Sequence, residues 1–196
     1  MFSHALIPHQ RVKSRKRHHL LLTSCREPLS DQYYRFSKGE CMEEKRLGAY
    51  IDIAIQREEE SYDFYTVLGS RLEDKGTKHA LELLAAEEKK HREFLEKYRD
   101  GGYGADALRM DKVIDYKIAE HMDMPAIDKD MKPEEVFLVA AHRELKSYNF
   151  YTGLAGLHPE GELKQIFLKM ASQELKHKEK VEYLYSNTAF PQTDGG

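Results

Sequence analysis

Apolar residues recur every three or four positions along four stretches of the chain, the spacing typical of amphipathic helices. The predicted helices cover about 43–75, 78–98, 133–156 and 162–185. Pro133 is a favoured first helical residue, and Glu134 and Glu135 follow it in the first turn. The pattern therefore predicts four long helices separated by breaks rich in Gly, Pro and charged residues.

The lengths of the connections predict how these helices pair. The turns within the first pair and within the second pair are short, so each pair forms an antiparallel hairpin. The link between the pairs, 100–132, is long and carries one short predicted helix at about 106–121. The sequence thus predicts an all-α protein, an antiparallel four-helix bundle of two helical hairpins joined by a long crossover.

The composition agrees with this fold and limits the kinds of partner that the sequence gives reason to expect. Among 196 residues, 33% are charged, 40% are hydrophobic and only 6 are Pro, which suits long helices with solvated outer faces. The net charge of −3 gives no reason to expect nucleic acid or an anionic membrane as a partner. No apolar run is long enough to span a bilayer. The two cysteines, Cys25 and Cys41, precede the predicted helices, so we expect a cytoplasmic protein without disulfides in its body.

The first part of the chain differs from the rest. Residues 1–41 are basic and lack a helical apolar period, and Leu20–Leu22 is too short for an export signal. Lys38-Gly39-Glu40 is compatible with a bacterial ribosome-binding sequence in the gene, so we expect translation to start at Met42. The predicted organisation is a disordered extension at 1–42, a bundle at 43–186 and a flexible tail at 187–196.

The chain contains an internal repeat with a fixed offset of 86 residues. Glu58 and the segment 61–68 recur as Glu144 and 147–154. Likewise, the Glu-x-x-His motif formed by Glu88 and His91 recurs in the second half as Glu174 and His177. Each half therefore has a lone Glu and, thirty residues later, a Glu-x-x-His.

These six residues form a candidate metal site. Residues three apart lie on one face of a helix, so Glu88 and His91 can converge on one ion, as can Glu174 and His177. Four carboxylates match the charge of two divalent ions, and oxygen-rich coordination with one imidazole per ion suits iron or manganese. About one Glu-x-x-His is expected by chance in so Glu-rich a chain, and charged helix faces are usually solvated. Two copies of the motif occur at equivalent places in a repeat, which favours a metal site over charged residues on a solvated surface.

Two tyrosines are candidates for a role in the reaction. Tyr65 and Tyr151 lie seven residues, two helical turns, after Glu58 and Glu144, which places them over the site. Core packing is the usual role of aromatic residues at helical spacing, and a hydrogen-bond donor or electron relay is the alternative. The remaining histidines have no partner at ligand spacing and are predicted to lie at the surface.

With these motifs placed, residues 43–186 resemble the rubrerythrin branch of the ferritin-like superfamily. The resemblance implies a buried pair of iron ions, usually in a homodimer, that reacts with hydrogen peroxide or dioxygen. By this analogy the metal ligands are Glu58, Glu88, His91, Glu144, Glu174 and His177. Manganese in place of iron stays open.

Two features depart from the family pattern. Rubrerythrins commonly carry a rubredoxin-like domain with Cys-x-x-Cys pairs, and this sequence contains none, so a separate electron donor such as a rubredoxin or a reductase is implied. They also commonly have a further Glu where this chain has Ser147, which matches Ser61 in the first repeat.

Three functions stay open at this point. The first is an oxidoreductase that reduces hydrogen peroxide, or oxidises ferrous iron with peroxide or dioxygen. The second is a protein that binds or stores iron without turnover. The third is a helical interaction module that the metal merely stabilises.

Overall fold

The computed structural model describes residues 31–102, 104–110, 112–128 and 130–190, and for 31–46 it describes the backbone only. Four long helices make up the bundle: α1 (Asp31–Ser70), α2 (Lys75–Arg99), α4 (Pro133–Gly156) and α5 (Glu162–Ala189). Two short elements lie in the crossover, the 3₁₀ helix η1 (Ala105–Ala107) and α3 (Ile118–His121). No strand occurs among the described residues.

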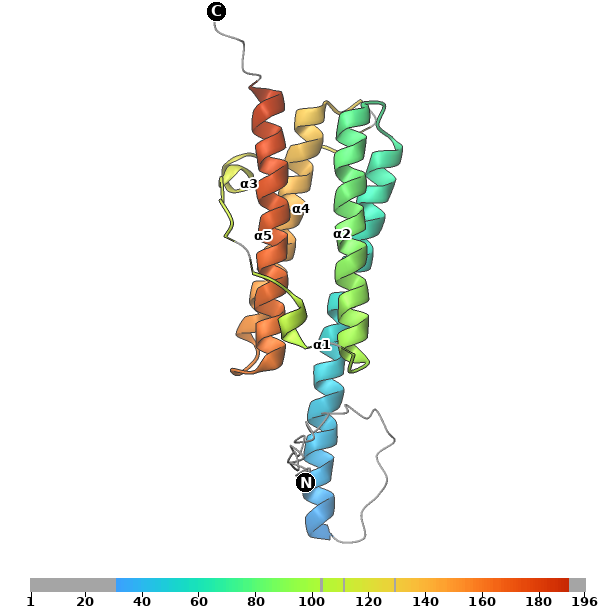
Figure 1. Ribbon diagram of the computed structural model, residues 1–196, viewed down its shortest axis with the longest axis vertical. Coiled ribbons are helices and arrows are strands. Elements are labelled where there is room, and N and C mark those ends of the chain that lie inside the picture. Colours follow the sequence, from blue (N-terminus) through green and yellow to red (C-terminus); the bar gives the residue numbers. More distant parts are fainter. Residues whose placement is uncertain (1–30, 103, 111, 129, 191–196) are drawn as a thin grey trace, which may run out of the picture.

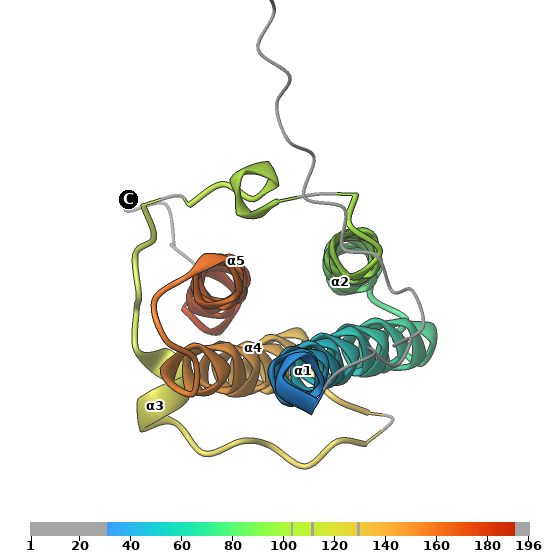
Figure 2. The same cartoon turned by 90° about the horizontal axis from the view of Figure 1, so that it is seen from below.

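The long helices occupy the four corners of a bundle, seen end-on in Figure 2. Helices α1 and α2 form one antiparallel hairpin, and α4 and α5 form the other (Figure 1). The crossover runs along the outside of α5 and α4 before it enters α4 (Figure 2). The predicted four-helix bundle of two hairpins with a long crossover is confirmed.

Local signals explain where the helices begin. Asp74 caps α2, because its carboxylate accepts a hydrogen bond from the Thr77 backbone N–H at 2.7 Å. Gly76, predicted to mark the break, therefore lies inside the first turn of α2. Helix α4 opens at Pro133 as predicted, with the Lys132 N–H donating to the Glu135 carboxylate at 2.8 Å.

Two predicted boundaries differ from the structure. Helix α1 begins at Asp31, well before Glu43, and its first part extends beyond the other helices (Figure 1). Helix α5 continues to Ala189, past the predicted end at Tyr185 and into the segment predicted to be a flexible tail. Most of the predicted N-terminal extension, 1–30, and residues 191–196 lie outside the described residues.

The prediction of a single helix at about 106–121 is also wrong. Only its two ends are helical, as η1 and α3, and Met110 and Ile114 between them are more than half exposed. A longer helix here would be stabilised by packing an apolar face against the bundle. This segment instead crosses the outer surface of α5.

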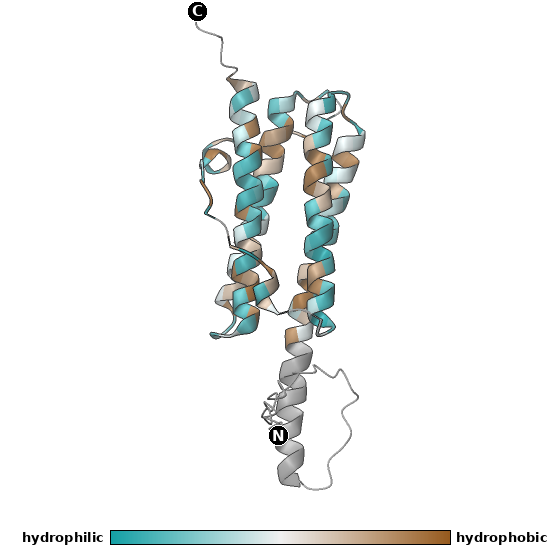
Figure 3. Cartoon of the chain, in the orientation of Figure 1, coloured by the Kyte–Doolittle hydropathy of each residue, from teal (hydrophilic) through white to brown (hydrophobic). Residues whose placement is uncertain are grey.

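The core consists of two apolar clusters, one on each side of a polar layer. One cluster includes Leu68, Leu81 and Val136, and the other includes Ile51, Leu95 and Phe167. Both clusters draw residues from both hairpins, so the hairpins share one core at each end. Figure 3 shows hydrophilic residues along the outer faces of the helices. Within the described part of the chain, no helix has the length and apolar character needed to cross a membrane.

A buried lysine anchors the crossover to the bundle. The side chain of Lys178 on α5 is fully buried, and its ammonium group lies 2.6 Å from Asp115, 2.9 Å from Glu120 and 2.9 Å from Glu182. The Glu182 carboxylate also accepts the backbone N–H of Ala119 at 2.8 Å. These carboxylates lie as close together as metal ligands do, but the lysine already supplies the cation between them.

We expect Lys178→Met to destabilise the metal-free protein by about 3–5 kcal/mol, since it leaves three carboxylates without their cation. Chemical denaturation measures this loss. The control is Lys164→Met on the same helix, which breaks an ion pair with the exposed Glu160 and should cost less than about 1 kcal/mol. Equal losses in the two variants would contradict the proposed anchor.

Candidate metal centre

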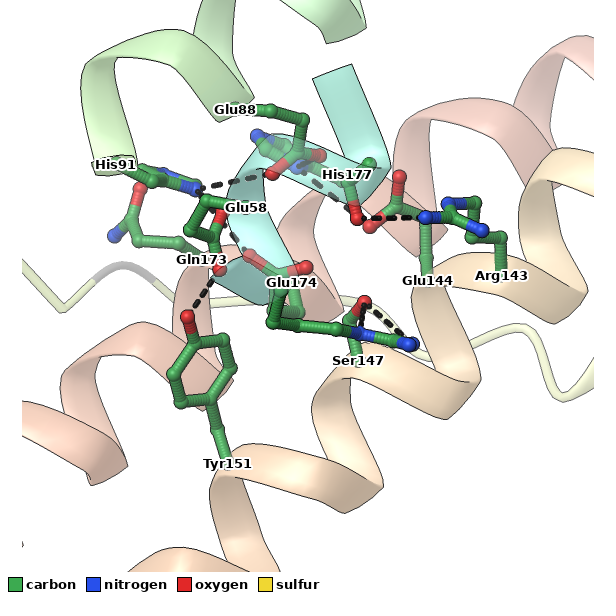
Figure 4. A network of polar contacts seen from close by, with 12 residues as sticks. Glu58, Glu88, His91, Arg143, Glu144, Ser147, Tyr151, Gln173, Glu174 and His177 are labelled. Atoms are coloured by element: carbon green, nitrogen blue, oxygen red, sulfur yellow. Dashed lines mark hydrogen bonds and ion pairs between the residues drawn. The ribbon is translucent and has the colours of Figure 1, made fainter. Parts of the chain in front are cut away.

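The polar layer contains all six predicted ligands, contributed by the four long helices (Figure 4). Each side chain is at least 95% buried. The contributing residues are Glu58 from α1, Glu88 and His91 from α2, Glu144 from α4, and Glu174 and His177 from α5. The repeat therefore places equivalent residues around one common centre.

The distances show that the ligand atoms converge. His91 Nδ1 lies 3.4 Å from Glu58, 3.4 Å from Glu88 and 3.3 Å from Glu174. His177 Nδ1 lies 3.3 Å from the other oxygen of Glu88 and 3.7 Å from Glu144. The two imidazole rings are stacked, with centroids 5.1 Å apart. Glu88 thus lies between the two histidines, one carboxylate oxygen facing each.

Seven polar atoms at this centre make no hydrogen bond to the protein. Both oxygens of Glu88 and of Glu174, one oxygen of Glu58, and Nδ1 of both histidines are buried without a hydrogen bond. Buried polar atoms are normally paired, because leaving one unpaired costs about 1–3 kcal/mol. Atoms bound to one metal ion at about 2.0–2.2 Å lie roughly 3–3.5 Å apart, which is the spacing seen here. The residues present therefore fit a metal site.

The pKa shifts show how the buried negative charge of the carboxylates is compensated without metal. Burial raises the pKa of Glu58 to about 7 and raises the pKa of Glu174 well above its ordinary value. Burial also acts on Glu88, but the imidazoles of His177 and His91 outweigh it and hold the pKa of that carboxyl well below its usual range. Burial disfavours the charged imidazoles, yet the surrounding carboxylates raise the pKa of His177 to about 10 and that of His91 well above its ordinary value. Without metal, burial therefore favours the neutral form of Glu58 and Glu174, and the carboxylates favour the charged form of both imidazoles.

The two predicted tyrosines contact the centre in a crossed arrangement. The Tyr65 hydroxyl donates a hydrogen bond to Glu144, and the Tyr151 hydroxyl donates to Glu58. The spacing predicted that both tyrosines lie over the site, and in the structure each hydroxyl contacts the Glu of the opposite helix. Burial and the nearby carboxylates raise the pKa of both phenols well above the ordinary value, so both keep their protons.

A second crossed pair of contacts was not anticipated from the sequence. Arg57 donates to the hydroxyl of Ser147 at 3.2 Å, and Arg143 donates to the hydroxyl of Ser61 at 3.3 Å. Each guanidinium also lies over an aromatic ring of the opposite helix, Arg57 over Phe150 and Arg143 over Phe64. All these positions are separated by the same 86 residues, so the repeat marked the residues but not which helix each one contacts.

The other described histidines lie away from the centre. His79 is exposed, as predicted, and His142 contacts the backbone carbonyl oxygen of Met122 at 2.8 Å. His158 is only partly exposed, because its ring packs edge-on against Tyr50 and tilted against Phe167. The prediction of a surface position is therefore wrong for His158.

The fold and the centre together define a class, the helical bundles that hold a Glu/His metal site between two hairpins. A family model described as Rubrerythrin matches residues 16–100, which include α1 and α2 with Glu58, Glu88 and His91. Helices α4 and α5 lie outside that match but carry the repeated Glu and Glu-x-x-His. Over residues 16–100 the chain is therefore similar to the rubrerythrin family, in agreement with the resemblance predicted from the sequence. No curated protein and no solved structure matches the chain.

The protonation of the metal-free centre can be measured directly. We expect the imidazole of His177 to remain charged at pH 8, since its pKa is about 10. Glu88→Gln should lower that pKa, because it removes the negative charge shared by the two imidazoles. An NMR titration of the imidazole resonances in metal-free protein checks both expectations. A wild-type His177 that titrates near 6.5 would contradict this distribution of protons.

Proposed function

We propose that this protein holds two iron ions at the six-residue centre and reduces hydrogen peroxide to water. The observation that carries the proposal is the set of seven unpaired, buried nitrogen and oxygen atoms on five of the six side chains. Carboxylate oxygens with one imidazole per ion suit iron, and manganese is the other metal with matching preferences. The bound metal pair would supply the two electrons that cleave the peroxide O–O bond.

The chain's own residues would provide charge balance and protons. Four carboxylates neutralise two divalent ions, so the loaded centre needs no further counterion from solvent. The Tyr65 hydroxyl holds a proton beside Glu144, and the Tyr151 hydroxyl holds one beside Glu58. Reduction of hydrogen peroxide to two waters consumes two protons, and the two phenols would hold protons next to two of the carboxylate ligands. The apolar clusters above and below restrict water at the centre.

The proposal includes two partners. Repeated turnover needs two electrons for each peroxide, which a separate electron-carrier protein such as a rubredoxin or a reductase would deliver. The homodimer implied by the resemblance would not need to share ligands, because all six side chains come from one chain.

Glu144→Ala should abolish tight iron binding and with it the rise in melting temperature that iron gives the wild type. A ligand present at 100 times its Kd stabilises the folded state by about 2.7 kcal/mol, so the loss is measurable by calorimetry. Elemental analysis of the same samples reports the iron content. The control is Glu60→Ala, which removes an exposed carboxylate from α1. Iron content that stays unchanged in Glu144→Ala would contradict the ligand assignment.

Anaerobic protein loaded with ferrous iron should consume one equivalent of hydrogen peroxide per two iron ions within the mixing time of a stopped-flow experiment. Tyr65→Phe and Tyr151→Phe should bind iron normally and react about 10²-fold more slowly, the lower end of typical proton-donor effects. Peroxide loss and ferrous iron are followed together. Slow or absent oxidation in the wild type would favour iron storage, and faster reaction with dioxygen than with peroxide would favour iron oxidation.

A further inference from the structure

The surroundings of the centre do not follow the twofold repeat. A groove of about 420 Å³ runs along the surface between α1 and α2, and Tyr65 forms part of its inner wall. Its lining includes small and apolar groups, those of Tyr62, Gly69, Ala85 and Ala86, together with the charged Lys78 and Glu82. Ala85 and Lys89, which also line it, flank the ligand Glu88 on α2.

The equivalent surface between α4 and α5 carries larger groups. Tyr151 packs against Phe167, with ring centroids 6.3 Å apart, and Phe167 occupies the position equivalent to Leu81. His158 also packs against Phe167, with centroids 5.5 Å apart. The residues equivalent to Gly69, Glu82 and Lys89 are bulkier or more apolar: Ala155, Leu168 and Leu175. The two halves therefore match at the centre and differ on their outer sides.

The size and chemistry of the groove indicate what it would hold. A water molecule occupies about 30 Å³, and hydrogen peroxide is little larger, so neither needs a groove of this volume. Sites for organic molecules typically measure about 300–1,000 Å³ and have mainly apolar walls. The Tyr65 ring joins the two regions, since its face lines the groove and its hydroxyl contacts Glu144.

We propose that this groove binds the organic group of an alkyl or aryl hydroperoxide, which approaches the centre from the Tyr65 side. The inference rests on the proposed function, because the same centre would reduce the hydroperoxide. In that reaction the O–O bond breaks, two electrons from the ferrous ions and two protons are consumed, and an alcohol and water form. Tyr65 is 1% exposed, so its ring must move aside for the reaction, whereas binding in the groove needs no such movement.

Binding can be tested without iron or turnover. The probe is 2-phenyl-2-propanol, the unreactive alcohol formed from cumene hydroperoxide, added to the metal-free full chain. We expect saturable NMR shifts at the backbone amides of Thr66, Gly69 and Ala86, and none at the equivalent Thr152, Ala155 and Ser172. Ala86→Phe should abolish the shifts by filling the groove, and the matched control Ser172→Phe should retain them. Absence of saturable shifts in the wild type, or equal shifts on both sides, would overturn the proposal.

Kinetics separate this inference from the proposed function. In iron-loaded protein, Ala86→Phe should lower the ratio of the rate with cumene hydroperoxide to the rate with hydrogen peroxide by about tenfold. Ser172→Phe should leave this ratio at the wild-type value. If wild type reacts with hydrogen peroxide but Ala86→Phe leaves the ratio unchanged, the groove is not the binding site. If wild type reacts with neither peroxide, the proposed function fails, and the alcohol titration still decides whether the groove binds organic groups.

Discussion

The arrangement of the molecule depends on the burial of four carboxylates and two imidazoles in one dry layer. Ionised groups are costly to remove from water, and the cost is reduced only by opposite charge, by protons or by hydrogen bonds. Here the layer lies between two apolar clusters that both hairpins share, so solvent cannot supply the compensation. In the metal-free state the pKa values of His91, His177 and Glu174 are raised, which favours protons that compensate the charge. Metal ions would replace these protons, so binding would release protons and stabilise the fold.

The contacts between α1 and α4 keep this layer in register. Both helices carry a Glu at the centre, and each Glu accepts a hydrogen bond from a tyrosine of the other helix. The Arg–Ser contacts repeat the exchange, since the arginine that precedes each Glu donates to a serine of the other helix. A shift of one helix along the other would break all four contacts together. The exchange therefore fixes the relative height of Glu58 and Glu144, which ligand geometry requires.

The internal repeat explains why so much of the centre was predictable. The offset of 86 residues identified all six convergent residues and both tyrosines, because a repeated polar residue on an apolar helix face needs a partner. It did not reveal the crossed contacts, since spacing along one helix cannot show which helix lies opposite. The crossover was the least predictable part. Its conformation depends on Lys178, whose burial against Asp115, Glu120 and Glu182 has no periodic signal.

The start of α1 was missed for a related physical reason. The apolar period used to find helices reports a face that packs, and α1 extends beyond the helices that could cover its first part (Figure 1).

The exchanged hydroxyl contacts also bear on how the chain came to have two halves. A single hairpin contains the donor of one exchanged contact and the acceptor of the other, so neither contact can form within that hairpin. Two identical hairpins related by a twofold axis would satisfy every contact and assemble the whole centre. Duplication of a short two-helix ancestor that first paired with itself would leave this geometry, and covalent fusion would then let each half diverge without losing its partner.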